Sequence, residues 1–211
     1  MEGRYILELR DRDPATVEDL VLDGCESTEI EGLSDKLVKL QSLSMVHVGL
    51  QSLKNLPKLP MLGKLDISDN SIAGGLEHVA DNCPELLHLN LASNKIAKIE
   101  DLEPLKKMKL CELDLFNNPL TAGSDGEYRS KIFEMIPSLQ ILDGADVNGE
   151  DVDDSLDGEV LSHFLYLVYG PLYMLQYRDE DESEEYKPSD ERRNEETNGD
   201  ESATKKKADD E

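Results

Sequence analysis

One phrase, Leu-x-x-Leu-x-Leu-x-x-Asn, recurs along the chain and limits its possible folds more than any other feature. The clearest copies read "LGKLDISDN" from Leu62, "LLHLNLASN" from Leu86 and "LCELDLFNN" from Leu110. Two weaker copies begin at Val17 and Leu40, so that successive starts lie 23, 22, 24 and 24 residues apart. This period and this pattern are typical of leucine-rich repeats.

Each copy is expected to place its Leu-x-Leu pair on a short β-strand. Side chains alternate between the two faces of a strand, so the leucines point inward and the residues between them point outward. One repeat cannot bury its apolar face alone, whereas stacked repeats bury a continuous core. We therefore predict an α/β fold, a leucine-rich repeat solenoid with a curved parallel sheet on the concave face and helices or 3₁₀ turns on the convex face.

The asparagine that closes the phrase is interpreted as structural. The turn after each strand leaves backbone groups without partners, and a buried amide side chain can bond them. Asn70, Asn94 and Asn118 are therefore expected to form a ladder. Cys25 and Val48 take this position in the first two repeats and cannot bond in the same way, so those turns should be looser or differently satisfied.

Both ends of a solenoid need a cap, because a bare terminal repeat exposes an apolar cross-section and an open sheet edge. A helix with Tyr5, Ile6 and Leu9 on its apolar face is expected to cover the first strand. A helix within residues 127–136 and a strand stub at 139–141 are expected to cover the last repeat. The segment 75–85 is predicted to be helical and the segment 99–109 to form a 3₁₀ turn.

Charge divides the chain into two parts. The sequence has 47 acidic and 22 basic side chains, a net charge of −25. Residues 1–144 hold 25 acids and 15 bases, whereas residues 145–211 hold 22 acids and 7 bases. We predict a repeat domain with its caps over residues 1–146 and an acidic, mostly disordered low-complexity tail over 147–211. A chain this acidic repels nucleic-acid phosphates and attracts basic partners, so no direct nucleic-acid ligand is expected.

The compartment is suggested by the N-terminal sequence and the cysteines. The first residues have scattered charges and no apolar run, so no secretory signal is expected. Cys25, Cys83 and Cys111 are an odd number without paired or metal-ligand spacing. A reducing compartment, the cytosol or the nucleus, fits best.

Longer stretches carry a family resemblance. "LELRDRDPATVEDLVLDGC", "LDISDNSIAGGLEHVADNCPELLHLNLASNKI", "LDLFNNPLT" and "YRSKIFEMIPSLQILDGAD" occur in this order within residues 1–146. They resemble the acidic leucine-rich nuclear phosphoproteins, also called the pp32 or LANP family. The resemblance implies a non-enzymatic protein with a curved leucine-rich domain and a flexible acidic tail. It also implies histone binding or chaperoning, inhibition of histone acetylation, inhibition of protein phosphatase 2A, and shuttling between nucleus and cytoplasm.

The sequence departs from this family after Asp146, where the family has a long, almost unbroken acidic tract. Residues 160–177, "VLSHFLYLVYGPLYMLQY", interrupt the acids with 18 residues that carry no formal charge. This length would allow a membrane span, but four tyrosines, a central Gly170-Pro171 and acidic flanks argue against one. We expect either an extra element packed on the last repeat or an unusual splice or gene-model product.

Outward positions of neighbouring strands form columns on the concave face, which is the favoured docking surface of a solenoid. The columns are Asp19, Ser42, Lys64, His88, Glu112; then Val21, Ser44, Asp66, Asn90, Asp114; then Asp23, Val46, Ser68, Ala92, Phe116. An aromatic residue among acids suits a basic peptide or helix. The predicted partner site comprises Asp19, Asp23, Asp66, Asn90, Asp114 and Phe116. The alternative is a solvated sheet face without a partner.

The acidic tail has two interpretations. Like charges at this density keep a segment extended and available, which favours electrostatic capture of histones or similar basic proteins. A tail that only solvates the chain is the alternative. Lys205, Lys206 and Lys207 near its end fit a minimal nuclear import signal and an ordinary polar tail equally well.

Other motifs indicate little chemistry. Residues 144–155 resemble part of a calcium loop but end on Ser155, where a bidentate glutamate is needed. The four histidines share no ligand spacing, and no catalytic or nucleotide-binding fingerprint occurs, so we expect no metal, no cofactor and no enzyme activity. Acidophilic kinases favour residues with an acid three positions later, here Thr16, Thr28, Ser124 and Thr197.

Two function hypotheses follow. The first is an acidic, monomeric chromatin adaptor of the nucleus and cytoplasm, which binds histones, limits their acetylation or assists their exchange, and restrains phosphatase 2A. The second is a leucine-rich scaffold for ribonucleoprotein or signalling partners without histone activity.

Overall fold

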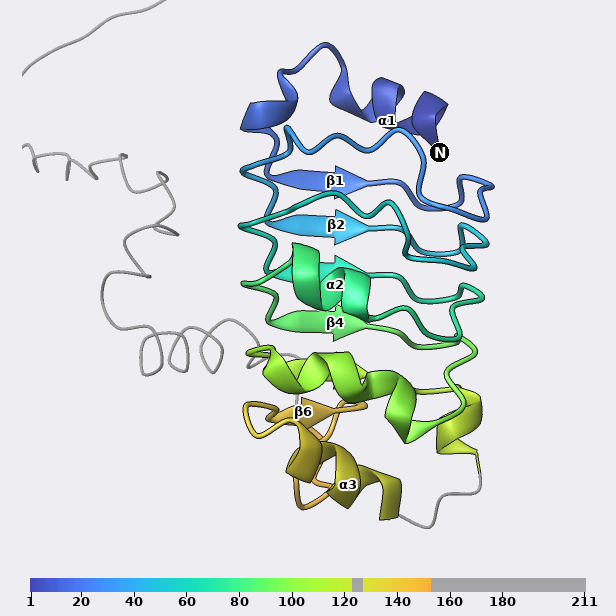
Figure 1. The fold of residues 1–211 in the computed structure, drawn as a ribbon, viewed down its shortest axis with the longest axis vertical. Coiled ribbons are helices and arrows are strands. Elements are labelled where there is room, and N and C mark those ends of the chain that lie inside the picture. The colour runs from blue at the N-terminus through green and yellow to red at the C-terminus, as the bar shows by residue number, and fades with distance from the viewer. Residues whose placement is uncertain (123–126, 153–211) are drawn as a thin grey trace, which may run out of the picture. The chain divides into compact units, whose positions relative to one another are not determined.

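The computed structural model describes residues 1–122 and 127–152 (Figure 1), and all of these belong to one compact unit, Met1–Leu156. The predicted acidic tail beyond residue 152, with its apolar segment 160–177, lies outside the described residues.

The core of the described region is a six-stranded parallel sheet whose strands follow the order of the chain. The strands are β1 (Asp19–Val21), β2 (Ser42–Ser44), β3 (Lys64–Asp66), β4 (His88–Asn90), β5 (Glu112–Asp114) and β6 (Ile141–Leu142). Their leucines pair in register across the sheet and are at most 2% exposed: Leu20, Leu43, Leu65, Leu89, Leu113 and Leu142. This stack confirms the predicted leucine-rich repeat solenoid.

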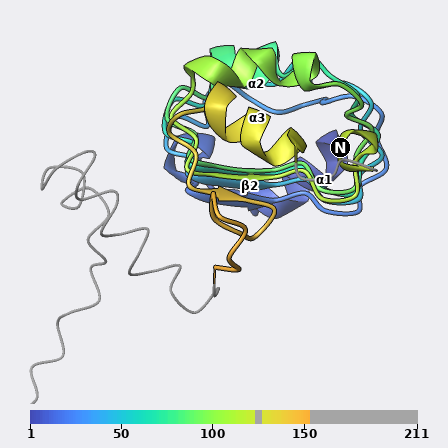
Figure 2. The ribbon, with the colours of Figure 1, turned by 90° about the horizontal axis from the view of Figure 1, so that it is seen from below.

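The segments that return from strand to strand lie opposite the sheet (Figure 2). They include the helix α2 (Glu77–Asn82) and the 3₁₀ helix η2 (Ile99–Lys107), as the sequence predicts for these segments. Proline at position 104 removes a backbone donor inside η2 and thereby favours the short 3₁₀ form. The apolar core fills the space between this layer and the sheet.

The N-terminal cap is the helix α1 (Glu2–Leu9), followed by the 3₁₀ turn η1 (Pro14–Thr16). Tyr5 is buried and Leu9 packs against the core. The prediction for Ile6 was wrong, because its side chain is 61% exposed. Tyr5 and Leu9 lie one helical turn apart and share a face, whereas Ile6 is rotated by about 100° away from Tyr5.

The C-terminal cap consists of the 3₁₀ turn η3 (Pro119–Thr121), the helix α3 (Glu127–Met135) and β6. Ile132 and Ile136 of the segment predicted to be the capping helix are buried, while Tyr128 and Phe133 are half-buried against the core.

The strand stub predicted at 139–141 was placed too early in the chain, because β6 is Ile141–Leu142. Leu142 is buried and pairs with Leu113, whereas Ile141 pairs with the outward residue Glu112. Leu139 and Leu142 therefore continue the Leu-x-x-Leu spacing of the repeat. Arg129 of α3 fixes the chain that follows, since its guanidinium donates to the carbonyl of Leu142 at 2.9 Å and to those of residues 145 and 146.

The asparagines of the repeat are buried and bonded to two repeats at once. Asn70 is 9% exposed, and its Oδ1 accepts the amides of Val48, Gly49 and Leu50 at 2.9–3.2 Å. The turn that contains Val48 is thus satisfied by the asparagine of the next repeat. Asn94 and Asn118 likewise donate from Nδ2 to carbonyls of their own and the preceding repeat.

Candidate protein-binding surface

The concave face is built from the outward side chains of β1 to β5. Strand pairing aligns the first column as Asp19, Ser42, Lys64, His88, Glu112 and the second as Val21, Ser44, Asp66, Asn90, Asp114. This register agrees with the alternation predicted from the sequence. It brings side chains separated by more than 20 residues in the chain next to one another.

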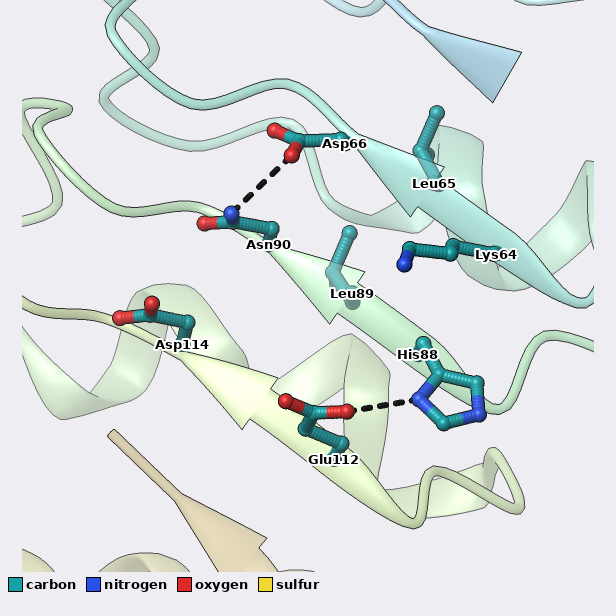
Figure 3. A pocket seen from close by; sticks show the side chains of 8 residues that line it. All are labelled: Lys64, Leu65, Asp66, His88, Leu89, Asn90, Glu112 and Asp114. Atoms are coloured by element: carbon teal, nitrogen blue, oxygen red, sulfur yellow. Dashed lines mark hydrogen bonds and ion pairs between the residues drawn. The ribbon is translucent and has the colours of Figure 1, made fainter. Parts of the chain in front are cut away.

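A hollow of about 120 Å³ lies in the middle of this face (Figure 3). Leucines of β3 and β4 and the outward residues of β3, β4 and β5 surround it, namely Lys64, Leu65, Asp66, His88, Leu89, Asn90, Glu112 and Asp114. Three of the predicted site residues, Asp66, Asn90 and Asp114, line this hollow. Its rim therefore combines three carboxylates, one amide, one imidazole and one ammonium group.

Side chains of the second column are held by the turns that follow their strands. In each case the side-chain Oδ1 accepts a hydrogen bond from the backbone amide two residues later. The amide of Ser68 donates to Asp66 at 3.0 Å, that of Ala92 to Asn90 at 2.9 Å and that of Phe116 to Asp114 at 2.8 Å. Asn90 also donates from Nδ2 to Oδ2 of Asp66 at 3.1 Å (Figure 3). The orientation of these groups is thus fixed before any partner arrives.

The first column contributes a paired acid that the predicted site omitted. His88 Nδ1 lies 2.7 Å from Oε2 of Glu112 (Figure 3). The hydrogen bond with His88 lowers the pKa of Glu112, burial opposes this, and the charges of His88 and Lys64 lower it further. Glu112 therefore remains ionised near neutral pH. The sequence could have indicated Glu112 as a site residue, because the alternation along the strand places both Glu112 and Asp114 on the outward face.

The remaining predicted site residues lie outside the hollow. Asp19 is exposed on β1. Asp23 Oδ1 accepts the hydroxyl of Ser44 at 2.6 Å and the amide of Val46 at 2.9 Å, so it serves the turn of the next repeat. Phe116 is 69% exposed beyond the end of β5. The predicted residues thus divide into a central group and residues at the margins of the face.

Asp143, which the predicted site lacks, lies beside Asp114 at the end of the sheet. Its Oδ1 accepts the amide of Leu115 at 2.7 Å. Burial raises the pKa of Asp143 to about 6; hydrogen bonds from the Leu115 and Phe116 amides oppose this, and the charge of Asp114 adds to it. The spacing Leu139, Leu142, Asp143 repeats Leu110, Leu113, Asp114, which is the signal that would have found it.

The predicted modification and targeting residues are described only in part. Thr16 and Thr28 are exposed, and the Thr16 hydroxyl donates to the carbonyl of Asp13 at 2.8 Å. Ser124, Thr197 and the lysines 205–207 lie outside the described residues.

Within residues 1–122 and 127–152, the structure holds no group of three or more histidine, cysteine or acidic side chains suited to a metal ion. In the same part of the chain, every helix is too short or too polar to cross a bilayer.

Comparison with known proteins agrees with the fold. A family model described as leucine-rich repeat matches residues 4–158. A chain in the crystal structure of the Drosophila melanogaster SNF/U2A′ complex is similar, with a TM-score of 0.56 and 26% sequence identity over 75% of this chain and 87% of that chain. A leucine-rich repeat fold indicates a role in protein–protein interaction.

Two relatives are similar over 158 residues, which is 74% of this chain. The acidic leucine-rich nuclear phosphoprotein 32-related protein 1 of Caenorhabditis elegans is 49% identical, and the match covers 68% of its length. The acidic leucine-rich nuclear phosphoprotein 32 family member A of Drosophila pseudoobscura pseudoobscura is 48% identical, and the match covers 59% of its length. The chain is a leucine-rich repeat protein and belongs to the acidic leucine-rich nuclear phosphoprotein 32 family.

Proposed function

We propose that this protein is a non-enzymatic, monomeric adaptor that binds histones through its concave face. In this role it acts as a histone chaperone and shields histone tails from acetylation. Inhibition of protein phosphatase 2A is a further activity of the same adaptor. The relatives are named nuclear phosphoproteins, which supports a nuclear location; movement to the cytoplasm is part of the proposal.

The observation that carries this proposal is the row of oriented carboxylates on the concave face. Asp66, Glu112 and Asp114 line one hollow, and Lys64 is the only lysine or arginine among the described residues that line it. Carboxylates that are already oriented lose little freedom when a lysine or arginine side chain binds. Phe116 adds an exposed aromatic ring on which a guanidinium group can stack.

The acidic tail is proposed to supply long-range electrostatic attraction for histones. Residues 147–211 carry 21 acids and 7 bases. Such a charge attracts a basic protein to the chain, and the attraction is screened over about 8 Å at physiological ionic strength. The tail is thus assigned to capture and the concave face to specific contact.

A second candidate function is favoured by the similarity to a chain of the SNF/U2A′ complex. In this alternative the protein is a scaffold for ribonucleoprotein or signalling partners and lacks histone activity. The concave face would then recognise one folded partner rather than basic tails.

The direct test is calorimetric titration of the full chain with purified core histones over a series of salt concentrations. The proposal predicts saturable binding at low salt that weakens steeply as salt is added. Absence of binding at low salt, together with recovery of one salt-resistant partner from nuclear extract, would favour the scaffold. Histone acetylation and phosphatase 2A assays with the same protein test the two inhibitory activities separately.

A further inference from the structure

The residues that directly follow the strands donate a series of hydrogen bonds from their backbone amides, and the last bond of this series is accepted by a carboxylate. In the inner repeats, the amide after each strand donates to the backbone carbonyl of the second-column residue in the next repeat. These bonds join Leu22 to Ser44, Met45 to Asp66, Ile67 to Asn90 and Leu91 to Asp114 at 2.8–3.0 Å. At the last repeat, the amide of Leu115 donates to the side-chain Oδ1 of Asp143 at 2.7 Å instead.

The register of β5 and β6 explains why a side chain, and not a backbone carbonyl, accepts the Leu115 amide. Leu113 pairs with Leu142, so the next residue, Asp143, stands in the second column opposite Asp114. Its φ of 51° lies in the left-handed region, where the chain turns away from the sheet. The Asp143 amide still donates to the carbonyl of Leu113 at 3.1 Å. The Asp143 carboxylate therefore takes the place that a backbone carbonyl has in the inner repeats, and it is the last acceptor in this series of hydrogen bonds.

The surroundings of Asp143 make this acceptor sensitive to protons. Asp114 on β5 is the charged group that acts on it, and its repulsion adds to the effect of burial, so the pKa rises to about 6. The nearby cation Arg129 on α3 is directed at the carbonyls of Leu142 and Ala145. Asp146 of the following turn bonds the amides of Asn148 and Glu150 and points its carboxylate there.

The bond from Leu115 connects this proton site to the concave face. Leu115 lies between Asp114, which lines the hollow, and Phe116, which is exposed beside it. We propose that Asp143 is a proton-responsive cap of the sheet, which sets the charge and packing of the Asp114–Phe116 turn and thereby the affinity of the concave face for a basic partner. The part that concerns a partner rests on the proposed function; the part that concerns the turn does not.

A basic partner beside Asp114 is attracted by the ionised form of Asp143 and not by the neutral form. Binding therefore competes with protonation, and the affinity should fall as the pH is lowered through the range in which Asp143 takes up its proton. Loss of one carboxylate charge at such a surface should weaken binding by about 3- to 10-fold.

The turn is tested first, without a partner, by following the amide resonances of Leu115 and Phe116 in the full chain from pH 7.5 to 4.5. The inference predicts a shared transition with a midpoint near the pKa of Asp143. In the Asp143→Asn variant, which keeps an oxygen acceptor, this transition should vanish. In Asp114→Asn it should move to lower pH, because the repelling charge is gone. Amides that do not titrate in the wild-type protein would overturn the inference, and this result needs no variant to fold.

The partner is tested with a synthetic peptide of lysine, arginine, serine and glycine. Its N-terminus is acetylated and its C-terminus is an amide, so its charge is constant between pH 5.5 and 7.5. The measured quantity is the ratio of its affinities at these two pH values. The ratio of the affinity at pH 7.5 to that at pH 5.5 should fall by about 2- to 3-fold in Asp143→Asn, because only part of Asp143 is protonated at pH 5.5. The control Asp35→Asn, in the exposed loop before β2, should leave the ratio unchanged. The same ratio is measured for a His88→Gln variant, because this change removes the one histidine among the described residues that line the hollow.

The outcomes separate the two proposals. A peptide that binds with the same ratio in wild type and Asp143→Asn would overturn the inference and leave histone binding intact. A protein that binds neither peptide nor histones would reject the proposed function, and the amide titration alone would then decide the role of Asp143 in the turn.

Discussion

Asn70 bonds six backbone groups of two neighbouring repeats, three through its oxygen and three through its nitrogen. The residue just before the asparagine position also follows a rule. Gly24, His47, Asp69, Ser93 and Asn117 hold this place, and all have positive φ. Glycine, asparagine, aspartate and histidine tolerate this conformation best. The sequence predicts the asparagines from their spacing, but it does not reveal which amides each one bonds.

Replacing Asn70 with alanine should lower the free energy of unfolding by about 3 kcal/mol, because the buried amides of Val48 and Leu50 lose their acceptor. Urea unfolding of the full chain measures this value. Asn82→Ala is the matched control and should cost about 1 kcal/mol, since the side chain of Asn82 makes a single hydrogen bond, to the Leu56 carbonyl. Equal losses of unfolding free energy in the two variants would contradict the structural role assigned to the asparagines.

Asp143→Asn should also change how stability depends on pH. The pKa of Asp143 is raised from 3.8 to about 6. The folded chain therefore holds this proton more tightly than the unfolded chain. The stability of the wild type falls as the pH rises from about 4 to about 6, and the full cost of the ionised Asp143 is present above about pH 6. At pH 7.5 the variant should be more stable than wild type by about 1–2 kcal/mol, after allowance for screening of a half-buried carboxylate.

This difference should narrow as the pH falls from 6 to 4, where the folded wild type takes up the proton. Thermal and urea unfolding of both proteins in the same buffers isolate the effect of this one group. A variant that is less stable at pH 7.5, or a difference that does not depend on pH, would contradict the assigned cause.

At the scale of elements, the repeat phrase predicts each strand, because the inward leucines have a fixed spacing. The caps are harder to predict, since each occurs once and has no second copy to align. Ile6 was placed inward because helical periodicity does not reveal which part of the apolar face meets the core. The stub was predicted at 139–141 because Leu142 was not aligned with Leu113.

The C-terminal cap should contribute substantially to stability through Ile132, which is fully buried under the last repeat. Ile132→Ala should cost about 2–5 kcal/mol, since it leaves a cavity in the core. Ile6→Ala on the exposed side of α1 should change stability by less than about 0.5 kcal/mol. Hydrogen exchange of the β5 and β6 amides would reveal local loosening in the first variant. Equal stability of the two variants would argue that α3 does not cap the core.

For the whole molecule, the sequence predicts the fold class, the order of the repeats and the columns of the concave face. It does not predict the hollow or the pairing of His88 with Glu112, because these depend on side-chain rotamers across neighbouring strands. Asp143 was missed because Leu142 was not aligned with Leu113, which left the next residue out of the second column.

Removing residues 157–211 should lower the affinity for core histones on the order of tenfold at low salt. The dependence of affinity on salt should also become less steep, because the tail contributes the long-range attraction. Circular dichroism of the shortened chain checks that the repeat unit is unchanged. An unaltered affinity with an unaltered salt dependence would remove capture by the tail from the account.

The central claim is that the carboxylates lining the hollow bind the basic partner. The most direct measurement compares the affinity of core histones at low salt for two double variants of the full chain with equal charge. Asp66→Asn with Asp114→Asn changes the concave face, whereas Glu77→Gln with Asp81→Asn changes exposed acids on α2. The account predicts a loss of roughly 5- to 30-fold for the first variant and almost none for the second. Equal affinities of the two variants would contradict it.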